Sequence, residues 1–133
     1  MRRNEAIACP CESGPTYVAC CAPLHRGEAI AQTAEALMRS RYSAYVRGDR
    51  IYLLATWHAS TRPSTLDFSD AAMTRWLGLD VRRHEQHDAD RATVEFIARY
   101  KTGGAPAVRL HEISRFVRED GRWFYVDGEF PSR

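Results

Sequence analysis

The four cysteines of this 133-residue chain lie close together near its start, at a spacing that suits a metal ion. Cys9 and Cys11 have one residue between them, and Cys20 and Cys21 follow as an adjacent pair after eight further residues. Zn²⁺ binds four thiolates in a tetrahedron, at about 2.3 Å from each sulfur. Because four sulfurs leave no open position, the pattern predicts a closed, structural zinc site.

Disulfides are the alternative use of these thiols. The first seven residues carry charge but lead into no apolar run of the kind that a secretory signal contains. No stretch approaches the roughly 18 apolar residues of a membrane span, so we expect a cytoplasmic protein whose thiols stay reduced. A bridge between Cys20 and Cys21 would close a strained ring. Zinc is therefore favoured, and His25 is a spare candidate ligand unless it is an ordinary loop histidine.

The segment between the two cysteine pairs contains a turn at Ser13-Gly14, followed by a proline. Pro15 suits the first position of a helix, because its ring fixes φ and its missing N–H is not needed there. We therefore expect a short helix over 16–19 that carries the second cysteine pair back to the first.

This stretch, with C-x-C, a Ser-Gly pair, an aromatic Tyr17 and then C-C, resembles the SEC-C motif. That motif is a small zinc-binding element found at the C-terminus of the SecA translocase motor and in other proteins. The chain departs from it at Glu12, where many members carry glycine. The resemblance implies one structural zinc per chain, with four ligands: Cys9, Cys11, Cys20 and Cys21.

Further runs along most of the chain are similar to the YchJ-like bacterial proteins: Pro23-Leu24-His25, Thr33 to Tyr45, Thr56-Trp57-His58, Thr61-Arg62-Pro63, Arg115 to Arg118, Gly121 to Trp123 and Asp127-Gly128. In those proteins a SEC-C motif precedes a domain similar to nuclear transport factor 2. The resemblance implies a zinc-binding element over residues 1–25 and a nuclear transport factor 2-like domain over residues 26–133. It implies little about activity.

The composition is that of a soluble globular protein, with 44% hydrophobic and 27% charged residues. Nineteen basic residues are mixed with seventeen acidic ones, for a net charge of +2. A dedicated nucleic-acid surface usually shows a concentrated basic patch, so the sequence gives no strong nucleic-acid signal.

Helices are expected in the first half of the body and strands in the second. Thr33 and Gly48 are favourable end residues for a helix over 34–47. We also expect helices over 50–58 and from Ser69 to Leu77, the last ended by Gly78. Alternating patterns between turns predict strands over 79–85, 91–102, 107–118 and 122–127. Helices followed by an antiparallel meander indicate an α+β fold. The resemblance adds the shape, which is N-terminal helices packed against a curved sheet that forms a cone.

A cone of this kind can enclose a pocket, and Arg41 is the first candidate for its lining. It falls within the apolar stripe of the helix over 34–47, where an unpaired charge would be costly. We hypothesise that it pairs with a carboxylate of the late strands, either as a structural ion pair or as part of an anion-binding site. The candidate lining residues are Arg41, Glu95, Glu112 and Asp127.

Two classes of function follow. The sequence has no Gly-rich phosphate loop, no G-x-S-x-G elbow and no H-E-x-x-H, so we expect a binding protein rather than an enzyme. In the first class, a zinc-binding adaptor uses its SEC-C element to dock a protein or ribosomal partner, by analogy with SecA. In the second, a small-molecule ligand or an acid–base reaction occupies the cone.

Overall fold

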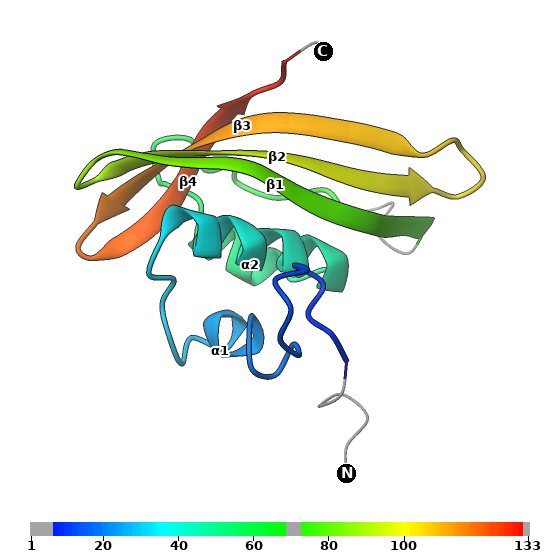
Figure 1. Ribbon diagram of the computed structural model, residues 1–133, viewed down its shortest axis with the longest axis horizontal. Helices are drawn as coiled ribbons and strands as arrows, with labels where there is room; N and C mark the ends of the chain where they lie inside the picture. The colour runs from blue at the N-terminus through cyan, green and yellow to red at the C-terminus, as the bar shows by residue number, and fades with distance from the viewer. Residues whose placement is uncertain (1–6, 69–72, 132–133) are drawn as a thin grey trace.

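The computed structural model describes residues 7–68 and 73–131, which form an α+β fold of helices followed by an antiparallel sheet (Figure 1). The sheet has four strands in the order β1-β2-β3-β4, and the helices lie on one side of it. The elements are α1 (Ala22–His25), α2 (Ala34–Arg47), α3 (Arg50–Ala55), β1 (Thr74–Asp88), β2 (Arg91–Thr102), β3 (Val108–Glu119) and β4 (Arg122–Glu129). The expected fold class is confirmed.

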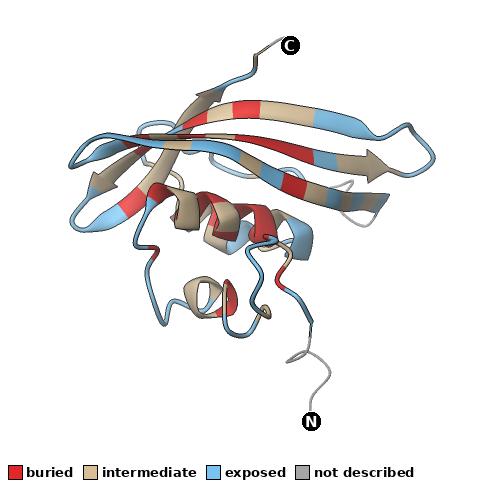
Figure 2. Ribbon diagram, in the orientation of Figure 1, coloured by how far each residue is buried: buried red, intermediate tan, exposed pale blue. Residues whose placement is uncertain are grey.

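The long helix α2 has the ends that its sequence predicts. Thr33 caps it, since the side chain accepts a hydrogen bond from the Ala36 amide at 3.0 Å. Gly48 ends it in the left-handed conformation, with φ of 71°. The face between these caps is buried against the inner side of the sheet, where Leu37, Met38 and strand residues form the core (Figure 2).

Irregular pairing helps to curve the sheet around α2. The register between β1 and β2 shifts at three places, and one more shift occurs between β3 and β4 at Arg115/Phe116. Such bulges add local twist and bend the strand that contains them. The sheet thus has an inner, concave face toward α2 and an outer, convex face.

The third helix, expected from Ser69 to Leu77, was predicted wrongly. Ser69 lies outside the described residues, but from Thr74 onward the chain is strand β1, paired with β2 as Thr74↔Thr102 and Trp76↔Tyr100. Trp76 contacts the core from this strand, so tertiary packing overrides the local helical pattern. Gly78 adjoins a register shift of β1 and ends no helix.

Two shorter helices also differ from expectation. Thr16 forms an antiparallel bridge with Ala8, residues 17–19 form turns, and the helix of this region, α1, begins only at Ala22. Helix α3 ends at Ala55 instead of residue 58, because Trp57 forms a parallel bridge with Tyr125 of β4. The backbone amide of His58 then donates to the Tyr125 carbonyl at 2.7 Å. Among the described residues, no helix is both long and apolar enough to cross a bilayer.

Candidate functional site

The cysteine cluster is a candidate metal site. All four Sγ atoms lie within 4.8 Å of one another, with 3.6 Å between Cys11 and Cys20 and 3.9 Å between Cys20 and Cys21. Sulfurs around a tetrahedral zinc are separated by about 3.8 Å, which follows from a zinc–sulfur bond of about 2.3 Å. The four thiols are free rather than bridged, so the donor set fits a metal ion held by four sulfurs.

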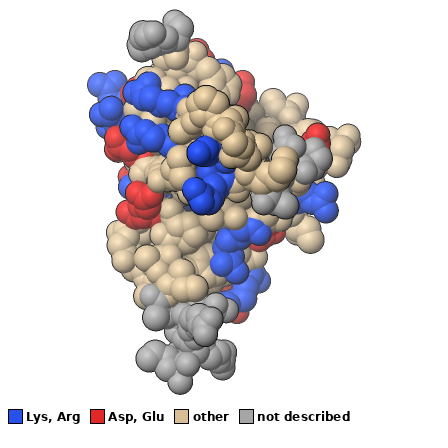
Figure 3. Space-filling view, turned by 90° about the vertical axis from the view of Figure 1, so that its right-hand side faces the viewer, with Lys and Arg blue, Asp and Glu red and all other residues tan. Residues whose placement is uncertain are grey.

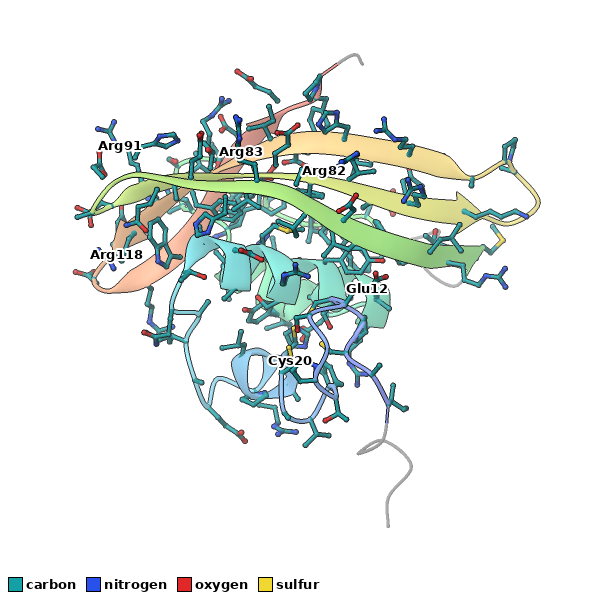
Figure 4. The ribbon with its side chains drawn as sticks, viewed as in Figure 1. Glu12, Cys20, Arg82, Arg83, Arg91 and Arg118 are labelled. Carbon is teal, nitrogen blue, oxygen red and sulfur yellow. The ribbon has the colours of Figure 1, made fainter. Side chains whose placement is uncertain are left out.

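Backbone hydrogen bonds fold the segment into a tight loop that presents these sulfurs. The Cys9 amide donates to the Pro15 carbonyl at 3.0 Å, and the Tyr17 amide donates to the Ile7 carbonyl at 2.9 Å. Glu12 adopts a left-handed conformation with φ of 63°, which explains why glycine is common at this position of the motif. Its carboxylate accepts a hydrogen bond from the Leu79 amide at 3.3 Å, so the strained residue also ties the loop to β1 (Figure 4).

The thiols do not ionise independently. A hydrogen bond from the Cys21 thiol lowers the pKa of Cys11, and Ser13 lowers that pKa further. The same hydrogen bond and burial raise the pKa of Cys21. For all four to ionise at once, a cation would be needed among the sulfurs, and a divalent metal would supply that charge.

The cysteine loop is attached to α2 as well as to β1. Arg39 donates to the Cys11 carbonyl at 2.7 Å while its Nε pairs with Glu35 at 3.0 Å. Figure 4 shows Cys20 below α2, on the side of the helix that faces away from the sheet. The loop and the body thus share specific contacts and are not joined by a linker alone.

His25 is neither a metal ligand in this arrangement nor a free loop residue. Its Nε2 lies 2.8 Å from the Ser40 carbonyl, which can only accept, so this nitrogen carries the proton. The other nitrogen, Nδ1, then accepts from the Tyr17 hydroxyl at 2.7 Å. Both ring nitrogens are used, and the half-buried histidine joins the cysteine loop to α2.

This role predicts a pH dependence of stability. Burial lowers the pKa of His25 below its ordinary value, so at acidic pH the unfolded chain binds a proton that the folded protein resists. The free energy of unfolding should therefore fall as the pH drops below about 6.5. The variant His25→Gln, which cannot titrate, should lose less stability than the wild type in urea unfolding between about pH 7.5 and about pH 5.5.

The matched control for this prediction is His87→Gln, which replaces an exposed histidine on β1, and the effect of His25→Gln should exceed the effect of this control. Equal loss of stability on acidification in the wild type and in His25→Gln would contradict the role of His25.

A cavity of about 470 Å³ lies between α2 and the inner face of the sheet. Aromatic rings make up much of its lining, and the rings contact one another, as Trp76 does with Tyr100 at 5.1 Å between centroids. Its lining residues are Met38, Arg41, Tyr42, Tyr45, Trp57, Thr74, Trp76, Phe96, Ala98, Tyr100, Thr102, Leu110, Glu112, Ser114, Phe116 and Tyr125.

Arg41 lines this cavity and is only 5% exposed. Its Nη1 donates to the Leu53 carbonyl at 2.8 Å and to the Thr56 hydroxyl at 2.7 Å, while the guanidinium lies over the Tyr125 ring at 4.6 Å from the centroid. Burial lowers its pKa. The hypothesis of a direct carboxylate partner was wrong: among the described residues no carboxylate lies within ion-pair distance of Arg41, whose hydrogen bonds go to neutral acceptors. Glu112, which lines the same cavity, acts on the guanidinium only at longer range and raises its pKa.

Glu112 also lines the cavity, and it is 7% exposed. Its Oε2 accepts hydrogen bonds from the Ser114 and Tyr125 hydroxyls, both at 2.8 Å. Gly128 of β4 lies opposite Ser114, and a Cβ at Gly128 would collide with the Glu112 carboxyl group, reaching its Cδ at 2.8 Å. The carboxylate therefore depends on a glycine in the neighbouring strand.

The other two predicted lining residues lie on the convex face. Glu95 alternates with cavity-lining Phe96 and bonds His111 at 2.7 Å, and Asp127 bonds Arg115 at 2.6 Å. Strand alternation places Glu95 on the face opposite Phe96. Asp127 is two residues from cavity-lining Tyr125, but the register shift at Arg115/Phe116 lies between them and turns Asp127 to the convex face.

The predicted lining residues also omitted several residues that shape the cavity. Tyr125 and Gly128 support Glu112 from β4, and the aromatic rings form the walls. Glu112 alternates in step with Leu110 and Phe116, so the three side chains face inward together, and this pattern could have identified Glu112 rather than Glu95 as a cavity residue. The register of β4 could not be inferred from the spacing of residues in the sequence.

A curved four-stranded antiparallel sheet that closes a cavity against a long helix defines an α+β protein of the nuclear transport factor 2-like class, here with a cysteine element attached. Residues 33–128 match the family described as "YchJ, middle NTF2-like domain". A UPF0225 protein of Ralstonia nicotianae is 59% identical over 132 residues, which cover 92% of this chain and 90% of that protein. A UPF0225 protein of Cupriavidus metallidurans is 61% identical over 127 residues, covering 91% and 87%. The chain belongs to the YchJ-like, UPF0225 family.

Two solved structures have the same architecture. A SEC-C motif-containing protein from Rhodopseudomonas palustris is 38% identical, with a TM-score of 0.82 over 92% of this chain and 98% of the other. A SEC-C motif-containing protein from Psychrobacter arcticus is 30% identical, with a TM-score of 0.79 over 98% and 86%. The expected family and its SEC-C element are thus confirmed.

Proposed function

We propose that the protein binds a small organic ligand in the cavity between α2 and the sheet. The observation that carries this proposal is a buried arginine, Arg41, that lines an aromatic cavity of about 470 Å³ without a carboxylate partner among the described residues. Ligand sites typically have volumes of about 300–1,000 Å³ and apolar walls with a few fixed polar groups. The ligand is then a flat, largely apolar molecule.

Arg41 supports an anionic group on that ligand. Only its Nη1 has hydrogen-bond partners in the described residues, so Nε and Nη2 remain as donors. A buried cation with no ion-pair partner is costly, and a carboxylate, sulfonate or phosphate can bind a guanidinium through two parallel hydrogen bonds. The Tyr125 ring holds the guanidinium in place by a cation–π contact.

Glu112 supports a hydrogen-bond donor elsewhere on the ligand. Its Oε2 already has two donors, whereas no described residue donates to Oε1. A ligand with an anion alone would be repelled by this carboxylate. An aromatic acid that also carries a hydroxyl or amine N–H satisfies both groups.

We further propose that the cysteine cluster holds one structural Zn²⁺ per chain, through Cys9, Cys11, Cys20 and Cys21. The number, softness and spacing of the sulfurs support zinc. A cytoplasmic location, proposed with it, would keep the thiols reduced. The metal would fix the loop that contacts α2 and β1 and would take no part in ligand binding.

Docking of a protein or ribosomal partner on the cysteine element is a second proposal. It is supported by two exposed apolar side chains of this element, Ile7 at 48% and Val18 at 37%. A zinc-free variant, described in the Discussion, would also lose this surface.

The ligand proposal is tested with anilinonaphthalene sulfonate, an aromatic anion that carries an amine N–H and fluoresces in apolar sites. The wild type should bind it with saturable stoichiometry. The variant Arg41→Met keeps an unbranched apolar stem but removes the guanidinium and its charge, and it should weaken the affinity by about 10- to 100-fold, because a charge-assisted hydrogen bond contributes about 1.5–3 kcal/mol.

The matched control is Arg50→Met, which removes an exposed arginine of α3 outside the cavity lining and should bind the probe as the wild type does. Thermal unfolding of each variant separates lost binding from lost folding. A folded Arg41→Met variant with unchanged affinity would contradict the proposal.

A further inference from the structure

One end of the convex face of the sheet carries four basic side chains: Arg75, Arg99, Lys101 and Arg109. We call them the hairpin-end cluster, because they lie beside the turn that joins β2 to β3. Their neighbours Thr74, Ala98, Tyr100, Thr102 and Leu110 line the inner cavity. Since side chains alternate between the two faces of a strand, the four basic residues project from the convex face.

Strand pairing places these cations directly beside one another. Arg75 of β1 is opposite Lys101 of β2, and Arg99 of β2 is opposite Arg109 of β3. Side chains in such positions have Cβ atoms about 5 Å apart, and like charges placed there destabilise the sheet. The cluster therefore has a cost for folding.

No described acidic residue neutralises the hairpin-end cluster. Among the described residues, none of its four side chains has an ion pair or hydrogen-bond partner. The next set of paired residues along this face begins with Asp80 of β1, whose carboxylate pairs with Arg82 at 3.2 Å.

Farther along the same face, charges are matched. Glu95 bonds His111, and Arg115 bonds both Asp127 and Glu129. Unbalanced positive charge is thus concentrated at one end of the face. Figure 3 looks onto this end of the molecule and shows several Lys and Arg side chains on its upper part.

We propose that the hairpin-end cluster binds the phosphodiester backbone of single-stranded nucleic acid. Three of its members are arginines, whose planar fork matches the geometry of phosphate oxygens. Cations about 5–7 Å apart, on adjacent strands or two residues apart on one strand, can contact successive phosphates. A flexible single strand can follow a convex surface, whereas a duplex is stiff over about 150 base pairs.

This binding would not depend on the nucleotide sequence. The aromatic residues next to the cluster, Trp76 and Tyr100, face the inner cavity and cannot stack on bases. Affinity would come from phosphate contacts alone, so it should fall steeply with salt. The cluster is not visible in the sequence, where basic and acidic residues are mixed. Strand alternation and register bring the four basic side chains together only in the folded sheet.

The test is fluorescence anisotropy of a labelled oligouridine of about 20 nucleotides, long enough for a typical single-strand site. Four phosphate contacts predict a slope of about −2.8 for log affinity against log salt, or about a 50-fold loss between about 50 and 200 mM salt. The variant Arg99→Gln/Arg109→Gln should bind more weakly at low salt and halve the slope to about −1.4. Because it also removes a like-charge pair, it should be no less stable than the wild type.

The control Arg91→Gln/Arg118→Gln removes the same charge at the opposite end of the sheet, where both arginines pair with aspartates (Figure 4). It should keep the wild-type slope. An equal loss in the control would overturn the proposal by showing that only net charge matters. No binding of the oligouridine, tighter binding of a duplex of the same length, or binding of anionic phospholipid vesicles in its place would also overturn it.

Discussion

Serine at positions 11 and 20 together is expected to abolish zinc binding and to unfold the cysteine element. Two sulfur ligands are then missing, and the free energy of binding structural zinc, about 10–16 kcal/mol in zinc-finger peptides, is also folding free energy. Elemental analysis should give about one zinc per chain in the wild type and essentially none in Cys11→Ser/Cys20→Ser. The wild type treated with a strong chelator should behave like the variant.

The body of the protein should respond to this loss in a limited way. The cysteine loop supplies partners to Arg39 and to the Leu79 amide, so α2 and the start of β1 lose hydrogen bonds when it unfolds. Hydrogen exchange should lose protection over residues 7–25 and keep it in the middle of β2 and β3. The control Ala19→Ser adds a hydroxyl at an exposed position of the same loop and should retain zinc. Zinc retained in the double variant would contradict the four-sulfur site, and global unfolding would contradict a separately folded body.

Alanine at position 128 is expected to destabilise the protein by about 2–4 kcal/mol, through the combined cost of overpacking and of lost hydrogen bonds to a carboxylate. The new methyl group would occupy the place of the Glu112 carboxyl group. Glu112 would have to move away from Ser114 and Tyr125, which currently donate to it. Urea unfolding measures this change directly, and binding of the fluorescent probe should weaken in parallel.

The matched control is Gly104→Ala, since a Cβ there meets nothing within 4 Å. That variant should have wild-type stability or be more stable by about 0.4–1 kcal/mol. A double-mutant cycle makes the test specific: in the background of Glu112→Ala, the change Gly128→Ala should cost little, because the colliding group is gone. Additive effects of the two substitutions would disprove the proposed collision.

The sequence was most informative where local chemistry decides the structure. The caps of α2 depend on residues a few positions apart, Thr33 with Ala36 and Gly48 with the preceding turn, and both were predicted. The cysteine cluster is similar, because C-x-C and C-C need only a short loop to converge. Glu12 is an instructive departure, since its unfavourable φ accompanies a contact to β1 that no local pattern could reveal.

The sequence was least informative where distant strands meet. The residues around Trp76 predict a helix, yet the pairing of β1 with β2 makes Trp76 part of a strand. Arg41 was placed in the interior correctly, but its acceptors come from α3, whose early end depends on the bridge of Trp57 to β4. Which of two acids faces the cavity, Glu112 or Glu95, depends on strand parity, and a shift of one residue exchanges the faces.

Heteronuclear NMR of the isotope-labelled protein with anilinonaphthalene sulfonate shows whether the probe binds between α2 and the sheet. A second hollow of about 280 Å³, lined in part by Leu24, Ile51 and Phe124, is the competing place for an apolar probe. Amide shifts should change at Arg41 and along the inner faces of β2 and β3, and Arg41→Met should abolish these changes. Shifts confined to the second hollow or to the convex face would contradict the ligand proposal.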